Sequence, residues 1–369
     1  MTQSIGCHIA HDSSSYEIEI GMGVWTCQAL FLSNIASNIA IIADETTGLL
    51  FGKKLQKQLL SSGLNVQLFT FPPGEVNKTR KTKEILEDQL LDQGFGRDSC
   101  IVALGGGITI DLAGFVAATY CRGIPIVMMP TSLLAMVDAS IGGKSGVNVS
   151  QGKNLVGAIH QPSKVVIELS FLQTLPQKEL ANGIVEMIKH GVIASYDHFA
   201  QLEKFGPNFG KDAATVSSLI AQSCLIKKEI IEADEKESGK RRLLNFGHTV
   251  GHALELLSGY SLSHGEAVAI GMLAESHLAV QRQLLAPAAL DRIKNLLNLC
   301  GLNLQLPQRF DVDRIIEAMS FDKKSLKKNP RFSMVEAIGS PLPLDGAYCT
   351  VVEREQLVQL CNWLKMSIR

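Results

Sequence analysis

Short apolar runs alternate with polar segments of helical period through the first half of the chain. Between residue 35 and about residue 170 the apolar runs are IAIIAD, LNVQLFTF, SCIVALG, IPIVMMP and KVVIEL. The segment KTRKTKEILEDQLLDQG, which separates two of them, carries its apolar residues at helical spacing. Buried strands that alternate with helices predict a mostly parallel sheet with helices on its faces, and we assign residues 1–170 to this α/β domain.

After residue 171 the pattern changes to long segments of helical period. These segments include KELANGIVEMIKHGVI, AATVSSLIAQSCLIKKEIIEADEKE and GEAVAIGMLAESHLAVQRQLL. A short β-like run, FSMVEAIG, comes late and is followed by a final amphipathic stretch, EREQLVQLCNWLKM. We therefore predict a mainly helical domain over residues 171–369, with one small strand pair.

Composition and charge exclude several classes of partner. The 369 residues are 46% hydrophobic and carry a formal net charge of −1, so no global positive field would attract a nucleic acid. No apolar run reaches the ~18 residues that a membrane span needs. The eight cysteines stand singly, and the N-terminus lacks the basic segment and apolar run of a signal peptide. We expect a cytoplasmic protein whose anionic ligands, if any, meet a local basic site.

A glycine triplet lies between a predicted strand and a predicted helix. Gly105, Gly106 and Gly107 follow SCIVAL and precede ITIDLAGF. Glycines let the backbone approach a ligand closely, and the N-terminus of the following helix offers free N–H groups to a phosphate. The spacing is not G-x-G-x-x-G, so a purely structural turn is an equal alternative to a pyrophosphate site.

Polar residues at other strand ends strengthen the cofactor interpretation. Asp44 ends IAIIAD, where it could accept hydrogen bonds from ribose hydroxyls, and Glu75 and Lys78 follow LNVQLFTF. The alternative for each of them is a solvated loop charge, which is the more common role of a single charged residue in a loop. The segment 130–154 is denser in polar residues and glycines, and we expect it to be a flexible loop that wraps a ligand. Its candidate contacts are Thr131, Ser132, Asp138, Lys144, Lys153 and Asn154.

The second half carries residues suited to a metal. Glu186, Lys189 and His190 share one face of a predicted helix, and a simple Glu–Lys ion pair is the alternative interpretation of that face. His248 and His252 are one turn apart, and His264 follows. Imidazoles and a carboxylate are ligands that zinc prefers, and three protein ligands would leave a position open for substrate. Spacing alone would pair His248 with His252, so the ligand set stays ambiguous.

Basic and amide residues lie near these histidines in the sequence. Lys227, Lys228, Arg241 and Arg242 flank the acidic run EADEKES, and Asn245 follows them. The basic residues could bind a substrate carboxylate and phosphate, or they could form surface ion pairs of little energetic value.

Six segments together resemble the 3-dehydroquinate synthase family. They are GGGITIDLAGFVAATYCRG, PTSLLAMVDASIGGKSGVN, GKNLVGAIHQP, NGIVEMIKHG, LLNFGHTVGHALE and SHGEAVAIGM, and the similarity extends from about Asp44 to Lys324. This resemblance implies a Rossmann-like α/β N-terminal domain with a parallel sheet and a mainly α-helical C-terminal domain. It also implies a homodimer.

The resemblance implies three sets of site residues. NAD would be bound by Asp44, Glu75, Lys78, Gly106, Gly107, Asp111, Thr131, Ser132, Lys153 and Thr174. The metal, Zn²⁺ or else Co²⁺, would be bound by Glu186, His248 and His264, which releases His252 to the substrate. Substrate would be contacted by Asp138, Lys144, Asn154, Lys189, Lys227, Arg241, Asn245, His252 and Lys324, with Arg122 lent across a dimer interface.

The reaction that the resemblance implies converts 3-deoxy-D-arabino-heptulosonate 7-phosphate into 3-dehydroquinate and phosphate, a step of the shikimate pathway. Three alternatives remain at this point. A sister sugar-phosphate cyclase such as 2-deoxy-scyllo-inosose synthase would take a substrate without a carboxylate. A dehydrogenase of the glycerol dehydrogenase type would release net NADH. A non-catalytic scaffold would have no reason to keep the metal-ligand and lysine set.

Overall fold

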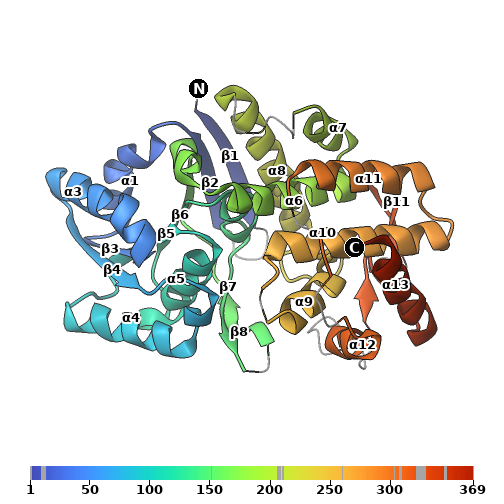
Figure 1. Ribbon diagram of the computed structural model, residues 1–369. Coiled ribbons are helices and arrows are strands. Elements are labelled where there is room, and N and C mark those ends of the chain that lie inside the picture. The colour runs from blue at the N-terminus through green and yellow to red at the C-terminus, as the bar shows by residue number, and fades with distance from the viewer. Residues whose placement is uncertain are drawn as a thin grey trace. The chain divides into compact units, whose positions relative to one another are not determined.

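The computed structural model describes the chain except residues 1, 10–13, 151, 206–208, 210–211, 260, 303, 307–309, 321–329, 345–346 and 369. The chain divides into two compact units, Met1–Leu175 and Pro176–Arg369. The first contains a large sheet and the second is built mainly of helices (Figure 1).

A seven-stranded sheet forms the first unit, in the order β1-β2-β9-β6-β5-β3-β4. Its strands are β1 (Gln3–Ile9), β2 (Ser14–Gly21), β3 (Asn38–Asp44), β4 (Asn65–Phe71), β5 (Ser99–Gly105), β6 (Ile126–Pro130) and β9 (Lys164–Glu168). All neighbours are parallel except β1 and β2. Strands β5, β6 and β9 are buried at every residue, which explains their continuous apolar sequences and confirms the predicted parallel sheet.

Helices cover both faces of this sheet. They are α1 (Ala29–Ile35), α2 (Glu45–Thr47), α3 (Lys53–Ser61), α4 (Arg80–Asp92) and α5 (Gly107–Thr119). Helix α3 lies on one face, and α4 and α5 lie on the other (Figure 1). Helix α4 begins at Arg80, after Thr79, whose hydroxyl caps it by accepting a hydrogen bond from the Thr82 N–H at 3.1 Å.

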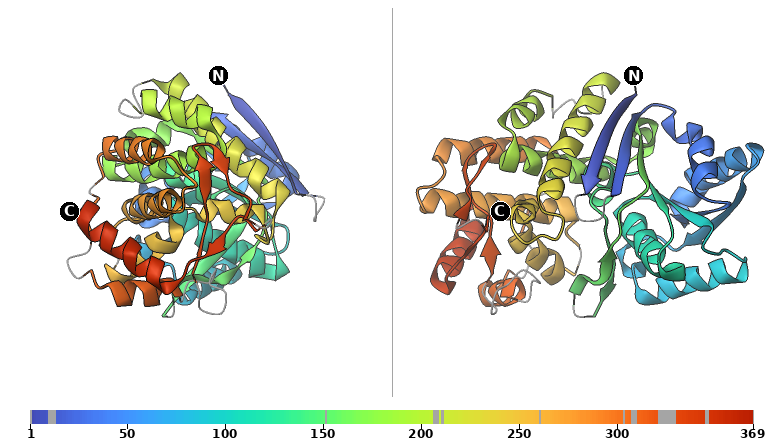
Figure 2. Two further views of the ribbon diagram at one scale, coloured as in Figure 1. Left: turned by 90° about the vertical axis from the view of Figure 1, so that its right-hand side faces the viewer. Right: turned by 180° about the vertical axis from the view of Figure 1, so that it is seen from behind.

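The N-terminal hairpin was not predicted. Strand β1 is the edge of the sheet and pairs antiparallel with β2 (Figure 2). Alternate residues of β1 are buried, as expected for a strand with one covered face. The period-two signal is therefore present in QSIGCHI, although it is weaker than the apolar runs of the central strands.

The expectation of a flexible loop over residues 130–154 was wrong. A π-helical turn, η5 (Ala135–Ala139), is followed by an antiparallel ribbon of β7 (Lys144–Val149) and β8 (Gly152–Ile159). A Cβ atom on Gly157 would lie 1.9 Å from the Ser145 carbonyl oxygen. The glycine at this position, just beyond the segment, permits close strand pairing, and Gly146 does the same, since a Cβ there would lie 2.8 Å from the Val156 carbonyl oxygen. Gly142 and Gly143 instead have positive φ angles of 93° and 68°, which glycine adopts readily.

The second unit contains eight α-helices among the residues that the structure describes. They are α6 (Gln177–Ala194), α7 (Tyr196–Phe205), α8 (Ala213–Ala233), α9 (His248–Leu257), α10 (His264–Gln281), α11 (Pro287–Leu299), α12 (Val312–Ser320) and α13 (Arg354–Ser367). Helix α10 is almost entirely buried and contacts α6, α9, α11 and α13. It forms the core on which the unit is assembled (Figure 2).

Short strands complete the second unit. Strand β10 (Arg331–Phe332) pairs with β13 (Thr350–Val351), and β11 (Val335–Ala337) pairs with β12 (Ser340–Pro341). The small β element that FSMVEAIG predicts is confirmed. Within the described parts of the chain, none of the helices is long and apolar enough to cross a membrane.

Candidate functional site

The carboxyl ends of β3 and β5 are neighbours at the point in the first unit where the direction of strand addition to the sheet reverses. Strand β4 lies on one side of β3 and β5 on the other. Strand β3 ends at Asp44, whose Oδ2 accepts a hydrogen bond from the Thr109 hydroxyl at 3.3 Å, and whose Oδ1 accepts the N–H groups of Thr46 and Thr47 at 2.9 and 3.0 Å. Ligands of open α/β sheets bind at the carboxyl ends of strands at such a switch point. Asp44 is thus an N-cap as well as a candidate ribose ligand.

The glycine triplet starts helix α5. Gly106 is the N-cap, and no side chain caps the helix and no acidic residue occupies its first turn. The first N–H groups of a helix lack intrahelical partners, so this end is suited to an anion. A Cβ on Gly105 would lie 2.4 Å from the Thr109 hydroxyl oxygen, whereas one on Gly106 would lie 3.4 Å from that of Ser132. Gly105 is therefore needed for the turn itself, and the residues after it fit a pyrophosphate.

Lys78 forms a buried polar cluster. Its side chain is 4% exposed, and its ammonium contacts the Asp111 carboxylate and donates to Asn154 Oδ1 at 2.6 Å. Burial raises the pKa of Asp111, and the charge of Lys78 opposes that rise. The structure thus joins two residues of the expected NAD set to one of the expected substrate set.

Glu75 connects its loop to the β7–β8 ribbon. Asn148 on β7 donates to Glu75 Oε1 at 2.7 Å, and Lys153 Nζ lies 3.8 Å from the same oxygen. Asn148 was not among the predicted residues. The two expected NAD contacts, Glu75 and Lys153, are therefore close together in space.

The other predicted residues of the first unit lie on turns, strand ends and a helical turn. Thr131 follows β6, Ser132 accepts from the Ala135 N–H, Thr174 is exposed in a 3₁₀ turn, Asp138 lies in η5, Lys144 begins β7, and Arg122 has a positive φ of 71°.

A carboxylate and two imidazoles converge in the second unit. Glu186 on α6 is fully buried, and its Oε1 lies 3.6 Å from Nε2 of His248 and 3.6 Å from Nε2 of His264. The three donor atoms lie within 4.8 Å of one another. Two imidazole nitrogens and one carboxylate oxygen match the ligands of Zn²⁺ or Co²⁺, with a coordination position left for substrate.

His252 lies beside this group. Its ring centroid is 5.2 Å from that of His248 and 6.3 Å from that of His264. With Glu255 and His264 it forms a second group of possible metal ligands, whose donor atoms also lie within 4.8 Å of one another. Because the Nε2 atoms of His248 and His264 both face Glu186, the geometry favours the ligand set that the resemblance implies over the His248–His252 pair.

Close helix packing makes this convergence possible. A Cβ on Gly271 of α10 would lie 1.8 Å from the carbonyl oxygen of Gly247, the N-cap of α9. A Cβ on Gly265 would lie 2.6 Å from Asn182 Oδ1 on α6, which instead accepts the Gly265 N–H at 3.2 Å. Glycines at both contacts bring the three helices that carry Glu186, His248 and His264 together. Sequence reasoning did not identify these glycines or Asn182.

The electrostatics of the cluster favour a cation. Burial opposes a charge on His264, yet the carboxylates of Glu255 and Glu186 raise its pKa to about 10. Lys189 on α6 contacts Glu186, and both side chains are at most 1% exposed. The predicted Glu–Lys ion pair therefore exists inside the candidate metal centre rather than as an alternative to it.

A carboxylate organises the segment that carries Arg241. Asp234 accepts the N–H groups of Ser238, Gly239 and Arg241 at 2.9, 2.7 and 3.0 Å. Burial opposes its ionisation, but these hydrogen bonds lower the pKa of Asp234. Arg241 is only 2% exposed, and its guanidinium donates to the Glu235 carbonyl. It is therefore not a surface ion-pair residue. The sequence analysis gave Asp234 no role, because its partners are backbone N–H groups of a loop that only the folded structure defines.

Three further residues of the predicted substrate set belong to the helical half of the chain. Asn245 donates to Glu237, Lys227 is buried on α8, and Lys324 lies outside the described residues.

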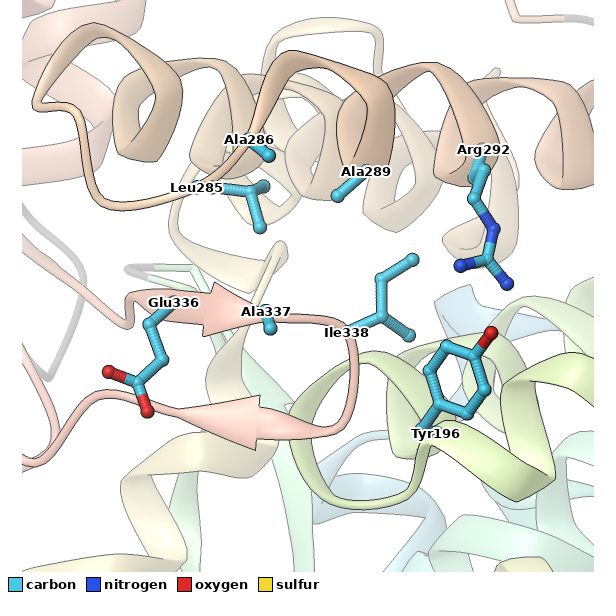
Figure 3. A pocket seen from close by; sticks show the side chains of 8 residues that line it. All are labelled: Tyr196, Leu285, Ala286, Ala289, Arg292, Glu336, Ala337 and Ile338. Atoms are coloured by element: carbon cyan, nitrogen blue, oxygen red, sulfur yellow. The ribbon is translucent and has the colours of Figure 1, made fainter.

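A small pocket lies elsewhere in this unit (Figure 3). It has a volume of about 170 Å³ and is lined by Tyr196, Leu285, Ala286, Ala289, Arg292, Glu336, Ala337 and Ile338. Arg292 is engaged by Glu203 at 2.6 Å and lies over the Tyr196 ring. None of the candidate metal ligands lines this pocket, and we assign it no part in the chemistry.

Comparisons with known proteins point to one enzyme family. Models described as 3-dehydroquinate synthase N-terminal and C-terminal match residues 68–182 and 183–325. The 3-dehydroquinate synthase of Synechococcus sp. is 42% identical over 347 residues, covering 91% of this chain and 94% of the relative. That of Desulforamulus reducens is 40% identical over 329 residues, covering 88% and 92%. The structure of 2-epi-5-epi-valiolone synthase from Streptomyces hygroscopicus, with NAD⁺ and Zn²⁺ bound, is 26% identical with a TM-score of 0.87 and covers 97% of this chain and 98% of that one.

Proposed function

The chain belongs to the 3-dehydroquinate synthase family, and we propose on that premise that it converts 3-deoxy-D-arabino-heptulosonate 7-phosphate into 3-dehydroquinate and phosphate. It is an enzyme of the phosphate-eliminating lyase class. The observation that carries the proposal is the position of Glu186 Oε1, 3.6 Å from Nε2 of His248 and of His264. A relative solved with NAD⁺ and Zn²⁺ supports the same cofactors here.

The residues present fit both groups. The uncapped start of α5 at Gly106 and Gly107, with Asp44 and the Lys78–Asp111 pair, would hold NAD. Glu186, His248 and His264 would hold the metal, for which we propose Zn²⁺. When bound, NAD supplies a transient hydride acceptor, and the metal supplies a Lewis acid that lowers the pKa of the alcohol to be oxidised.

The protein's own residues bind and orient the substrate. Arg241 is the candidate clamp for the substrate carboxylate, since a planar guanidinium can hold a carboxylate through two hydrogen bonds. It would act together with Lys324. Holding the phosphate in a fixed position promotes its elimination, a task that suits Lys189 and His252 in the helical unit and Lys144 and Asn154 in the first. Asp138, Lys227 and Asn245 complete the proposed substrate contacts.

Two further assignments rest on the family and on the cysteines. We propose a homodimer in which Arg122 is lent to the partner's substrate. We also propose a cytoplasmic location, because all eight cysteines are free, as is usual for thiols in a reducing compartment.

The direct test incubates purified enzyme with NAD, Zn²⁺ and either 3-deoxy-D-arabino-heptulosonate 7-phosphate or glucose 6-phosphate. We expect phosphate and 3-dehydroquinate from the first substrate only, with no net absorbance of NADH. Turnover of glucose 6-phosphate instead would identify a sister cyclase. Stoichiometric NADH would identify a dehydrogenase.

A further inference from the structure

We propose that Glu255 is a positioning residue that holds His264 in the orientation and tautomer required for metal binding. The inference rests on the proposed metal centre and adds a residue to it. Glu255 Oε2 lies 3.4 Å from Nδ1 of His264, and Glu255 is 3% exposed. The carboxylate therefore meets the ring nitrogen that does not face Glu186.

The hydrogen-bond partners fix which nitrogen carries the proton. A carboxylate can only accept, so Nδ1 of His264 donates to Glu255. In the neutral ring that metal binding requires, the lone pair is then left on Nε2. That Nε2 is the atom 3.6 Å from Glu186 Oε1. Holding the proton on Nδ1 thus presents the ligand nitrogen to the metal centre.

The second histidine is held in the same way by a different group. His248 Nδ1 lies 3.1 Å from the carbonyl oxygen of Phe246, which also only accepts, and its Nε2 likewise faces Glu186. Both imidazoles are therefore fixed through Nδ1 and converge through Nε2. Only Glu255 adds a negative charge, which increases the basicity of the ligand nitrogen.

Helix geometry places Glu255 for this task. It lies on α9 about two turns after His248, so the helix that begins with one ligand also carries the carboxylate that orients the other. The close packing of α9 on α10 at Gly271 brings that carboxylate to His264. A direct ligand role for Glu255 fits less well, because its oxygen faces Nδ1 while both Nε2 atoms point to Glu186.

The test uses Co²⁺ as the probe, since its visible spectrum reports both affinity and ligand geometry. Enzyme is stripped with chelator and titrated with Co²⁺ as wild type, Glu255→Gln and Glu255→Ala. Loss of such an orienting partner typically weakens metal binding about 10–100-fold. We expect Glu255→Ala to show this loss with altered visible bands. Glu255→Gln should fall between Ala and wild type, because its amide oxygen still accepts from Nδ1 but carries no charge.

Controls separate this role from folding and from the metal centre itself. Glu275→Gln makes the same change at another buried carboxylate. Glu275 is fully buried on α10, about three turns after His264, and this variant should bind Co²⁺ like wild type. His264→Ala should lose the wild-type Co²⁺ spectrum; if it does not, the proposed ligand set is wrong. If His264→Ala fails to bind but both Glu255 variants bind Co²⁺ within about twofold of wild type and with its spectrum, only the role of Glu255 is overturned.

Discussion

Arg241 illustrates how a single buried charge can be prepared for a ligand. Its side chain is nearly inaccessible, and its backbone N–H is fixed by Asp234, which also binds two other N–H groups of the same loop. Because the buried Arg241 side chain is already ordered in the folded protein, binding a substrate would cost it little further conformational entropy. The arrangement suits recognition of a substrate carboxylate.

Replacing Arg241 with Ala should raise KM and lower kcat/KM by about 10–100-fold, the usual loss for hydrogen bonds to charged groups. Steady-state kinetics with 3-deoxy-D-arabino-heptulosonate 7-phosphate would measure it. Arg242→Ala, at the neighbouring position, is the matched control and should leave the kinetics near wild type. Unchanged kinetics in Arg241→Ala would refute the role as a clamp.

Asp234→Ala should lower kcat/KM through Arg241 rather than through the substrate. Because the two residues would act as one unit, the double variant Asp234→Ala/Arg241→Ala should be little worse than Arg241→Ala alone. A double-mutant cycle on kcat/KM measures this coupling. Additive losses would show that Asp234 acts independently of Arg241.

At this scale, the sequence named the groups that we propose to carry the chemistry but not the groups that we propose to orient them. Glu186, His248 and His264 stand in recognisable motifs. Asp234 accepts hydrogen bonds from a loop backbone, and Glu255 contacts an imidazole on another helix; these partners are defined only by the folded structure.

At the scale of helices and strands, the glycines were the hardest residues to interpret from the sequence, because glycine occurs both in flexible loops and at close backbone contacts. The central strands were predictable because their burial on both faces produces long apolar runs. The ribbon of β7 and β8 was missed because its glycines and polar residues resemble those of a loop. Between α9 and α10, glycines likewise serve close contact, here at Gly247 and Gly271.

Gly271→Ala should separate α9 from α10. The new Cβ would lie 1.8 Å from the Gly247 carbonyl oxygen, which is backbone and must shift. Overpacking of this kind costs about 1–3 kcal/mol of unfolding free energy, and a lower melting temperature and weaker metal binding should follow. Gly6→Ala, where a Cβ meets nothing within 4 Å, is the control and should melt near wild type. Equal melting temperatures would contradict the packing argument.

For the molecule as a whole, one buried histidine should make stability depend on pH. His198 is 1% exposed, and burial lowers its pKa to about 4, although Gln222 partly opposes this. Between pH 6.5 and 4 the unfolded chain binds a proton at His198 that the folded chain does not. Stability is therefore lost as the pH falls through this window, by up to about 3 kcal/mol.

His198→Gln should flatten that dependence. Between pH 7 and pH 5, with chelator present, the melting temperature of wild type should fall further than that of the variant. His8→Gln, at an exposed position on β1, should behave like wild type. The same fall in wild type and His198→Gln would exclude His198 as the cause.

The most direct test of the account is phosphate release by enzyme stripped with chelator and titrated with Zn²⁺, in the presence of NAD and 3-deoxy-D-arabino-heptulosonate 7-phosphate. Stripped enzyme should be inactive, and about one equivalent of Zn²⁺ per chain should restore release without net NADH. Glu186→Gln should need far more Zn²⁺. Full activity of the stripped enzyme, or a wild-type titration by Glu186→Gln, would contradict the metal centre on which the account rests.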